Sequence, residues 1–156
     1  MEGGGVPSEG SILVVMLSAI GDSVLVLPVV SALRRAHPGA HITWVLQPGP
    51  HELVGNHPAV DEFVLFQRGR RSRNPVSLLN GLRSLGDTLR ALQESAARHA
   101  GGHFDLLLDL QVYFKAGILT ALAPARVKLG FDRSRARDLN WLFTTHRVPS
   151  PPGRFA

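Results

Sequence analysis

The stretch SILVVMLSAIGDSVLVLP, residues 11–28, carries the most information about the fold. Its first part, residues 12–17, is an apolar and β-branched run typical of a buried parallel strand, and its last part has the pattern of an amphipathic helix. A tight turn containing Gly21 and Asp22 separates the two. In open α/β sheets, ligands bind in the crevice beyond the carboxyl ends of the strands. The sequence therefore puts an ionisable group, Asp22, where such folds do chemistry.

The rest of the chain alternates between predicted strands and predicted helices. Strict alternation of this kind means a parallel sheet with right-handed crossovers. We therefore predict a Rossmann-like α/β fold with five parallel strands and helices on both faces. The predicted strands are residues 11–17, 41–46, 60–66, 104–110 and 126–131, and the predicted helices are residues 22–36, 52–56, 75–100 and 114–122.

Helical periodicity gives each of the two long helices one apolar face. Asp22 or Ser23 is the predicted N-cap of the first helix, and Gly101 and Gly102 are predicted to end the second. The face of the first helix consists of Leu25, Val29, Ala32, Leu33 and Ala36, and that of the second consists of Leu78, Leu79, Leu82, Leu85, Leu89 and Leu92.

Length and composition narrow the class of protein. The 156 residues are enough for one domain with a substantial core, and the absence of cysteine excludes disulfides, thiolate metal sites and cysteine nucleophiles. The polar start lacks the basic region of a signal peptide, and no stretch approaches the roughly 18 apolar residues of a membrane span. We expect a cytoplasmic protein with a disordered tail at residues 1–10, a domain at 11–148 and the start of a linker at 149–156.

The net charge is +5, and nearly all of the basic residues are arginine, since Lys115 and Lys128 are the only lysines. Arginine suits bidentate binding of phosphate or carboxylate, although a GC-rich genome also favours it. Two basic runs follow predicted strand ends and so share an edge with Asp22. They are either solvated loops or a site for acceptor phosphates or a membrane surface. The runs contain Arg68, Arg70, Arg71 and Arg73, and Arg133, Arg135 and Arg137.

The turn after the first strand has two interpretations. Asp22 is either a helix cap or a general base that takes a proton from an attacking hydroxyl. Gly21 is either a turn residue or a position that lets a ligand approach the backbone. The turn lacks the glycines of a dinucleotide fingerprint and of a Walker P-loop.

A second candidate site follows the strand at residues 104–110. Asp109 and Lys115 are either a helix cap and a solvated residue, or part of a site in which Gln111 and Lys115 contact sugar hydroxyls and phosphates. The seven histidines show no metal-binding spacing on a common element, and we expect no metal or other cofactor.

Three separated segments together resemble glycosyltransferase family 9, the bacterial lipopolysaccharide heptosyltransferases. The first is LSAIGD at residues 17–22 with PGAHITW at 38–44, the second is FDLLLDLQ at 104–111 with Lys115, and the third is KLGFD at 128–132 with Arg135 and Arg137. The family pattern has Gly and Ser where this chain has Val112 and Ala116, so the resemblance does not identify the acceptor.

The resemblance implies the N-terminal half of a GT-B fold, whose acceptor side includes Asp22 as base. Ser18, Gly21, Gln111, Lys115 and the basic runs would then bind substrate. The implied partners are a nucleotide-sugar donor, held by a C-terminal domain that this chain lacks, and an anionic glycan or glycolipid acceptor.

The resemblance also implies peripheral contact with the inner face of the inner membrane and, because the donor domain is missing, a chain that is inactive alone. The alternatives are a non-enzymatic basic domain for nucleic acid or an anionic membrane surface, and an inactive remnant. We expect no nucleic acid, because the basic runs lack the aromatic residues of a single-strand binder.

Overall fold

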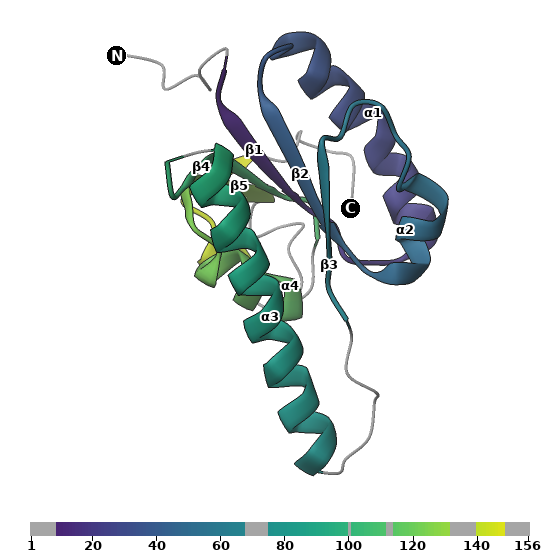
Figure 1. Ribbon diagram of the computed structural model, residues 1–156, viewed down its shortest axis with the longest axis vertical. Helices are drawn as coiled ribbons and strands as arrows, with labels where there is room; N and C mark the ends of the chain where they lie inside the picture. Colours follow the sequence, from purple (N-terminus) through teal and green to yellow (C-terminus); the bar gives the residue numbers. More distant parts are fainter. Residues whose placement is uncertain (1–8, 68–74, 100, 112–113, 132–139, 149–156) are drawn as a thin grey trace, which may run out of the picture.

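The structure is a computed structural model that describes residues 9–67, 75–99, 101–111, 114–131 and 140–148. These form a parallel sheet of order β3-β2-β1-β4-β5-β6 with helices on both faces (Figure 1). The predicted Rossmann-like α/β fold is therefore confirmed. The strands are β1 Ser11–Val15, β2 His41–Leu46, β3 Glu62–Leu65, β4 Phe104–Asp109, β5 Ala125–Phe131 and β6 His146–Val148. The helices are α1 Ile20–Ala36, α2 Pro48–Val54, α3 Pro75–His99, α4 Phe114–Leu122 and the short 3-10 helix η1 Asn140–Phe143.

The sheet has six strands in the described part of the chain, so the prediction of five was wrong. The additional strand, β6, pairs in parallel with β5 through Leu129 opposite His146 and Phe131 opposite Val148. All three side chains of β6 are exposed. It therefore has no apolar run, which was the signal used to recognise the other strands.

The helix after β2 also begins earlier than predicted. The sequence indicated one turn at residues 52–56, with prolines interrupting the chain before it, whereas α2 begins at Pro48. Proline is favoured in the first turn of a helix, where its missing N–H would have no intrahelical partner. Pro48 thus starts the helix immediately after Gln47.

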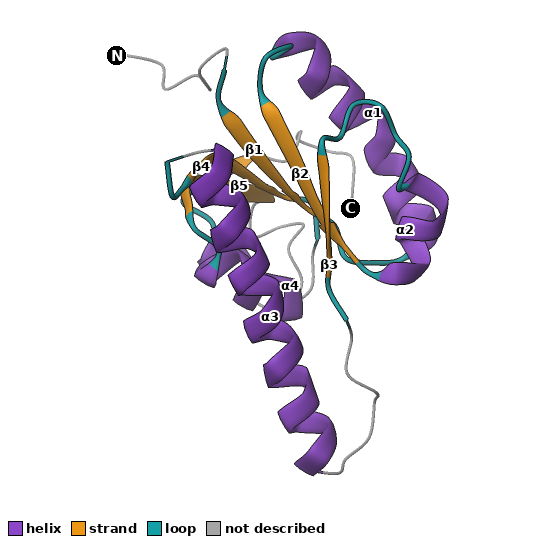
Figure 2. Cartoon of the chain, in the orientation of Figure 1, coloured by secondary structure: helices purple, strands orange, loops and turns teal. Residues whose placement is uncertain are grey.

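Helices lie on both faces of the sheet (Figure 2). Side chains alternate along each strand, so two apolar layers form on opposite faces of the sheet. On β1, Ile12 and Val14 face the layer that contains Val26 and Val30 of α1 and the fully buried Trp44. On the same strand, Leu13 and Val15 face the other layer, which α3 and α4 cover. That layer includes Leu92, Leu107 and Leu119, all fully buried.

Helix α1 buries a different face from the predicted one. Its buried residues are Ser23, Val26 and Val30, whereas Leu25 is 74% exposed and Val29 is also exposed. Apolar residues surround most of this helix, so periodicity alone did not select the face that meets the sheet. The tertiary contacts with β1 and β2 select it.

Helix α3 buries its apolar face only in its C-terminal half. Leu92 is fully buried, but Leu78 is 70% exposed, because the N-terminal half projects beyond the sheet (Figure 1). Gly101 and Gly102 follow the helix with φ angles of 59° and 99°, which favour glycine, so their predicted role in ending the helix is confirmed. Among the described residues, no helix is long and apolar enough to cross a bilayer.

Candidate functional site

The strand order reverses direction at β1 and β4, which creates a switch point at the carboxyl edge of the sheet. β2 and β3 lie on one side of β1, and β4 to β6 lie on the other. The last residue of β4, Asp109, pairs with the last residue of β1, Val15. Asp22 follows β1 in the first turn of α1. Both carboxylates therefore belong to the edge where open α/β sheets bind ligands, as predicted.

Asp22 stabilises the start of α1 from inside the helix. The N-cap is Ala19, so the prediction that Asp22 or Ser23 occupies that position was wrong. The Oδ2 atom of Asp22 instead accepts the backbone N–H of Ala19 at 3.2 Å, and the buried Ser23 hydroxyl donates to the Ala19 carbonyl at 3.1 Å. This is the returning half of a capping box. The Asp22 side chain is exposed to solvent.

A cavity of about 570 Å³ opens beside this turn. Its walls are the β1–α1 loop, the start of α2 and the segment after β3. The first two walls are joined by a hydrogen bond, in which the N–H of Gln47 donates to the Leu17 carbonyl at 2.9 Å. Two residues predicted to bind substrate, Ser18 and Gly21, line the cavity. The lining residues are Ser18, Ala19, Ile20, Gly21, Gln47, Pro48, Gly49, Pro50 and Gln67.

Gly21 is not required by the local backbone. It lies in the first turn of α1, and its backbone has none of the positive φ angles that favour glycine. A Cβ atom added there would meet no other atom within 4 Å. The interpretation of Gly21 as a turn glycine therefore lacks support, and Gly21 is one of the residues that line the cavity.

Asp109 and Gln111 connect the end of β4 to α4 and to the loop after β1. Asp109 is 1% exposed, and its carboxylate accepts the N–H of Gln111 at 3.0 Å and the hydroxyl of Thr120 in α4 at 2.8 Å. The buried Gln111 side-chain amide donates to the Ser18 carbonyl and contacts the Met16 sulfur at 3.4 Å. Gln111 thus fixes the loop after β1 to the end of β4. Its predicted contact with sugar hydroxyls stays a prediction.

The remaining predicted substrate-binding residues lie outside the described part of the chain. These are Arg68, Arg70, Arg71, Arg135 and Arg137, together with the side chain of Lys115. Of the chain's two lysines, Lys128 is described. Burial lowers the pKa of Lys128, and its Nζ donates to the Ala121 carbonyl at 2.6 Å, so this cation fixes β5 to the end of α4.

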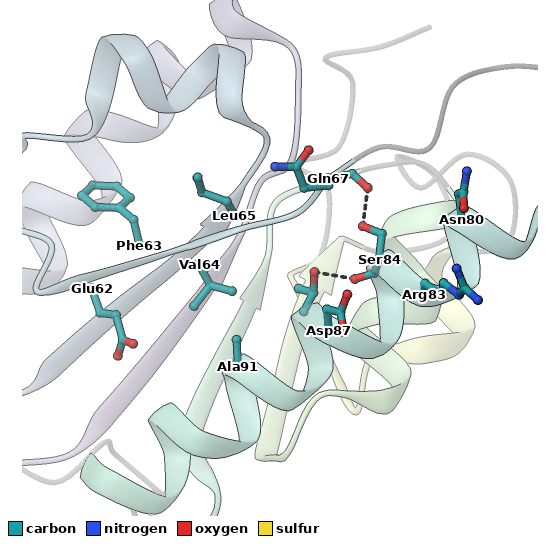
Figure 3. A pocket seen from close by; sticks show the side chains of 11 residues that line it. Glu62, Phe63, Val64, Leu65, Gln67, Asn80, Arg83, Ser84, Asp87 and Ala91 are labelled. Carbon is teal, nitrogen blue, oxygen red and sulfur yellow. Dashed lines mark hydrogen bonds between the residues drawn. The ribbon is translucent and has the colours of Figure 1, made fainter. Parts of the chain in front are cut away.

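A second cavity, of about 420 Å³, lies between β3 and α3 (Figure 3). Its helix wall carries Asn80, Arg83, Ser84 and Asp87. Gln67 lines both cavities, and its carbonyl accepts the hydroxyl of Ser84. Only the leucines of this helix were predicted to form a face, so these polar residues were missed. The spacing of these polar residues, three or four apart, was the signal for the second face of α3.

Comparison with known proteins relates the chain to one family. Residues 95–156 match glycosyltransferase family 9 (heptosyltransferase). Lipopolysaccharide core heptosyltransferase OpsX of Haemophilus influenzae is 28% identical over 141 residues, which is 90% of this chain and 35% of that protein. Lipopolysaccharide heptosyltransferase 1 of Pseudomonas aeruginosa is 30% identical over 129 residues, which is 81% of this chain and 34% of that protein.

A solved structure agrees with these matches. The E. coli heptosyltransferase WaaC with ADP-2-deoxy-2-fluoro heptose superposes with a TM-score of 0.72 and 25% identity, covering 93% of this chain and 44% of that one. The predicted resemblance to glycosyltransferase family 9 is confirmed, as is the predicted likeness to half of a GT-B fold. The chain spans about a third of the length of these curated relatives.

Proposed function

We propose that this chain, a relative of glycosyltransferase family 9, is the acceptor-side half of a GT-B glycosyltransferase. The complete enzyme would transfer a heptose-like sugar from a nucleoside diphosphate donor to a lipopolysaccharide-core type of acceptor. The names of its relatives support this class of donor and acceptor. The observation that carries the proposal is the cavity at the carboxyl edge, with open space at Gly21 immediately before Asp22.

In the proposed reaction, an acceptor hydroxyl lies at this cavity and Asp22 takes its proton. The hydroxyl oxygen forms a bond to the anomeric carbon of the donor sugar. The bond from that carbon to the diphosphate breaks on the opposite face, and the nucleoside diphosphate leaves with the electron pair. Transfer in one displacement inverts the anomeric centre. Gln111 acts as a positioning residue, because it holds the carbonyl of Ser18 at the cavity wall.

The test is Asp22→Asn in a complete enzyme that joins this domain to a compatible donor domain. Turnover should fall by about 10² to 10⁴, the usual contribution of a general base. The fold should persist, because the Asn side-chain oxygen can still accept the Ala19 N–H. Losing the charge near the helix N-terminus costs about 0.3–1 kcal/mol. Glu52→Gln, an exposed change in α2, is the matched control.

Two outcomes distinguish the roles of Asp22. A stable but inactive variant supports the general base. Turnover within a few-fold of the parent would show that Asp22 acts only by stabilising the start of the helix. The control variant should retain the parent's turnover and stability in either case.

We also propose that the domain contacts the anionic inner face of the inner membrane through the N-terminal half of α3. Val76, Leu78 and Leu82 are 58–70% exposed there, and the preceding sequence, residues 68–73, contains four arginines. Apolar side chains beside basic residues are the combination that binds anionic bilayer surfaces. Cosedimentation of the chain with anionic and with neutral vesicles tests this contact.

The double variant Leu78→Ser and Leu82→Ser should weaken vesicle binding more than tenfold, because each buried leucine contributes about 1.5–3 kcal/mol. The control is Leu25→Ser, which changes a leucine that is equally exposed on α1. Binding of the chain should also fall with added salt. Equal binding to neutral and anionic vesicles, or an equal effect of the control, would contradict the proposal.

A further inference from the structure

Three potential metal ligands meet at the amino edge of the sheet, opposite the cavity of the candidate site. His41 is the first residue of β2, Glu62 is the first of β3, and His99 is the last of α3. One ligand atom from each lies within 4.8 Å of the other two. The Nε2 atom of His41 is 3.4 Å from Oε2 of Glu62, and the two imidazole rings stack with centroids 3.7 Å apart.

We propose that His41, Glu62 and His99 form a binding site for a divalent transition metal of the zinc class. Two imidazole nitrogens and one carboxylate oxygen are ligands that zinc prefers, with water as the fourth ligand. Bonds of about 2.0–2.1 Å in a tetrahedral site put ligand atoms roughly 3.3 Å apart. The ligand atoms lie within 4.8 Å of one another, so they must approach by up to about 1.5 Å, and His99, the least buried of the three, is exposed at the end of α3. Mg²⁺ and Ca²⁺ select oxygen ligands, so two imidazoles disfavour them.

The surroundings of Glu62 suit a metal-binding carboxylate. Burial raises its pKa, but hydrogen bonds from Ser95 and His41 and the charges of Arg98 and His41 outweigh burial, so the pKa is lowered overall. The Ser95 hydroxyl donates to Oε2 at 2.6 Å, and Arg98 donates to Oε1 at 2.8 Å. Such partners orient a ligating carboxylate. The positive charge of Arg98 also weakens attraction for a cation, so we expect micromolar affinity.

A bound metal would join three elements that come from distant parts of the sequence. It would fix the last turn of α3 to the first residues of β2 and β3. The site is at the opposite edge of the sheet from Asp22. Metal binding there would stabilise the folded domain, and the site does not depend on the proposed glycosyl transfer.

The experiment is titration of the metal-stripped 156-residue chain with Zn²⁺ by calorimetry, together with Co²⁺ absorption and thermal melts. We expect one Zn²⁺ per chain, a visible Co²⁺ spectrum displaced by Zn²⁺, and no binding of Mg²⁺ at the same concentrations. At about 100 times Kd, the melting temperature should rise by roughly 5–10 °C. A chelator should reverse the rise.

The variant His99→Gln should weaken Zn²⁺ binding at least tenfold, while its circular dichroism spectrum shows that it folds. His103→Gln is the matched control, since His103 is an exposed histidine outside the cluster. Absence of saturable Zn²⁺ binding below about 1 mM would overturn the proposal. So would a His99→Gln variant that binds like the parent, since the cluster would then be an ion pair with stacked rings only.

Discussion

Substituting Gly21 by alanine separates the stability of α1 from the use of the cavity beside it. Glycine within a helix is less stable than alanine by about 0.5–1 kcal/mol. No atom lies within 4 Å of the added Cβ, so the new methyl group causes no clash. The domain should therefore gain about 0.5–1 kcal/mol. For a chain of this size that raises the melting temperature by about 1–4 °C.

The same methyl group should weaken ligand binding if Gly21 keeps the cavity open. Steric displacement of a well-packed group costs about 1–3 kcal/mol, which is roughly a fivefold to 150-fold loss of affinity. The assay is calorimetric titration of the chain with a phosphorylated lipopolysaccharide-core oligosaccharide, alongside thermal melts. Gly86→Ala in α3 is the control, because its added Cβ also meets nothing within 4 Å.

The control variant should gain stability without any change in affinity. A fall in the melting temperature of the Gly21→Ala variant would refute the reasoning about open space at the helix start. Raised stability with unchanged affinity would mean that no ligand approaches Gly21.

Three further predictions follow from buried or partly buried groups. In urea titrations, Leu92→Ala should lower the free energy of unfolding by about 2–5 kcal/mol because the side chain is fully buried. Leu82→Ala should change it by no more than about 0.5 kcal/mol because Leu82 is 58% exposed. Thr120→Val keeps the shape of the side chain but removes a 2.8 Å hydrogen bond to the buried Asp109 carboxylate. It should cost about 1–3 kcal/mol, and an unchanged urea midpoint would show that Asp109 does not need this donor. The pKa of Glu62 is lowered in the folded state, so its contribution to stability is present above its ordinary pKa and lost as pH falls through the lower folded value. In the Glu62→Gln variant, the free energy of unfolding should therefore depend less on pH in that acidic window. The same pH dependence as in the parent would show that the pKa of Glu62 is not lowered by folding.

The order and type of most elements could be predicted from the amino-acid pattern alone. Short segments rich in apolar and β-branched residues marked the five longer strands, and the helices between them required parallel pairing. That topology also determined that Asp22 and Asp109 belong to one edge, because the carboxyl ends of parallel strands coincide. The end of α3 was readable as well, since Gly101 and Gly102 adopt φ angles that favour glycine.

The exact starts of helices were harder to predict, because one residue type can occupy several positions near a helix start. Asp22 follows the rules for an N-cap, yet the helix begins at Ile20 and Asp22 acts from within the first turn. The start of α2 was predicted too late in the sequence, because a proline such as Pro48 can either interrupt the chain or begin a helix. These choices depend on one hydrogen bond or one backbone angle, and sequence pattern does not resolve that level of detail.

Which surfaces meet depends on contacts between elements that are distant in the sequence. Apolar residues surround most of α1, so packing against β1 and β2 determined that Val26 and Val30 are buried while Leu25 is exposed. β6 forms because β5 offers an edge to pair with, without an apolar run of its own. The meeting of His41 with His99 has the same origin. Sequence periodicity describes neighbours along one element. These contacts join elements that come together only when the sheet forms.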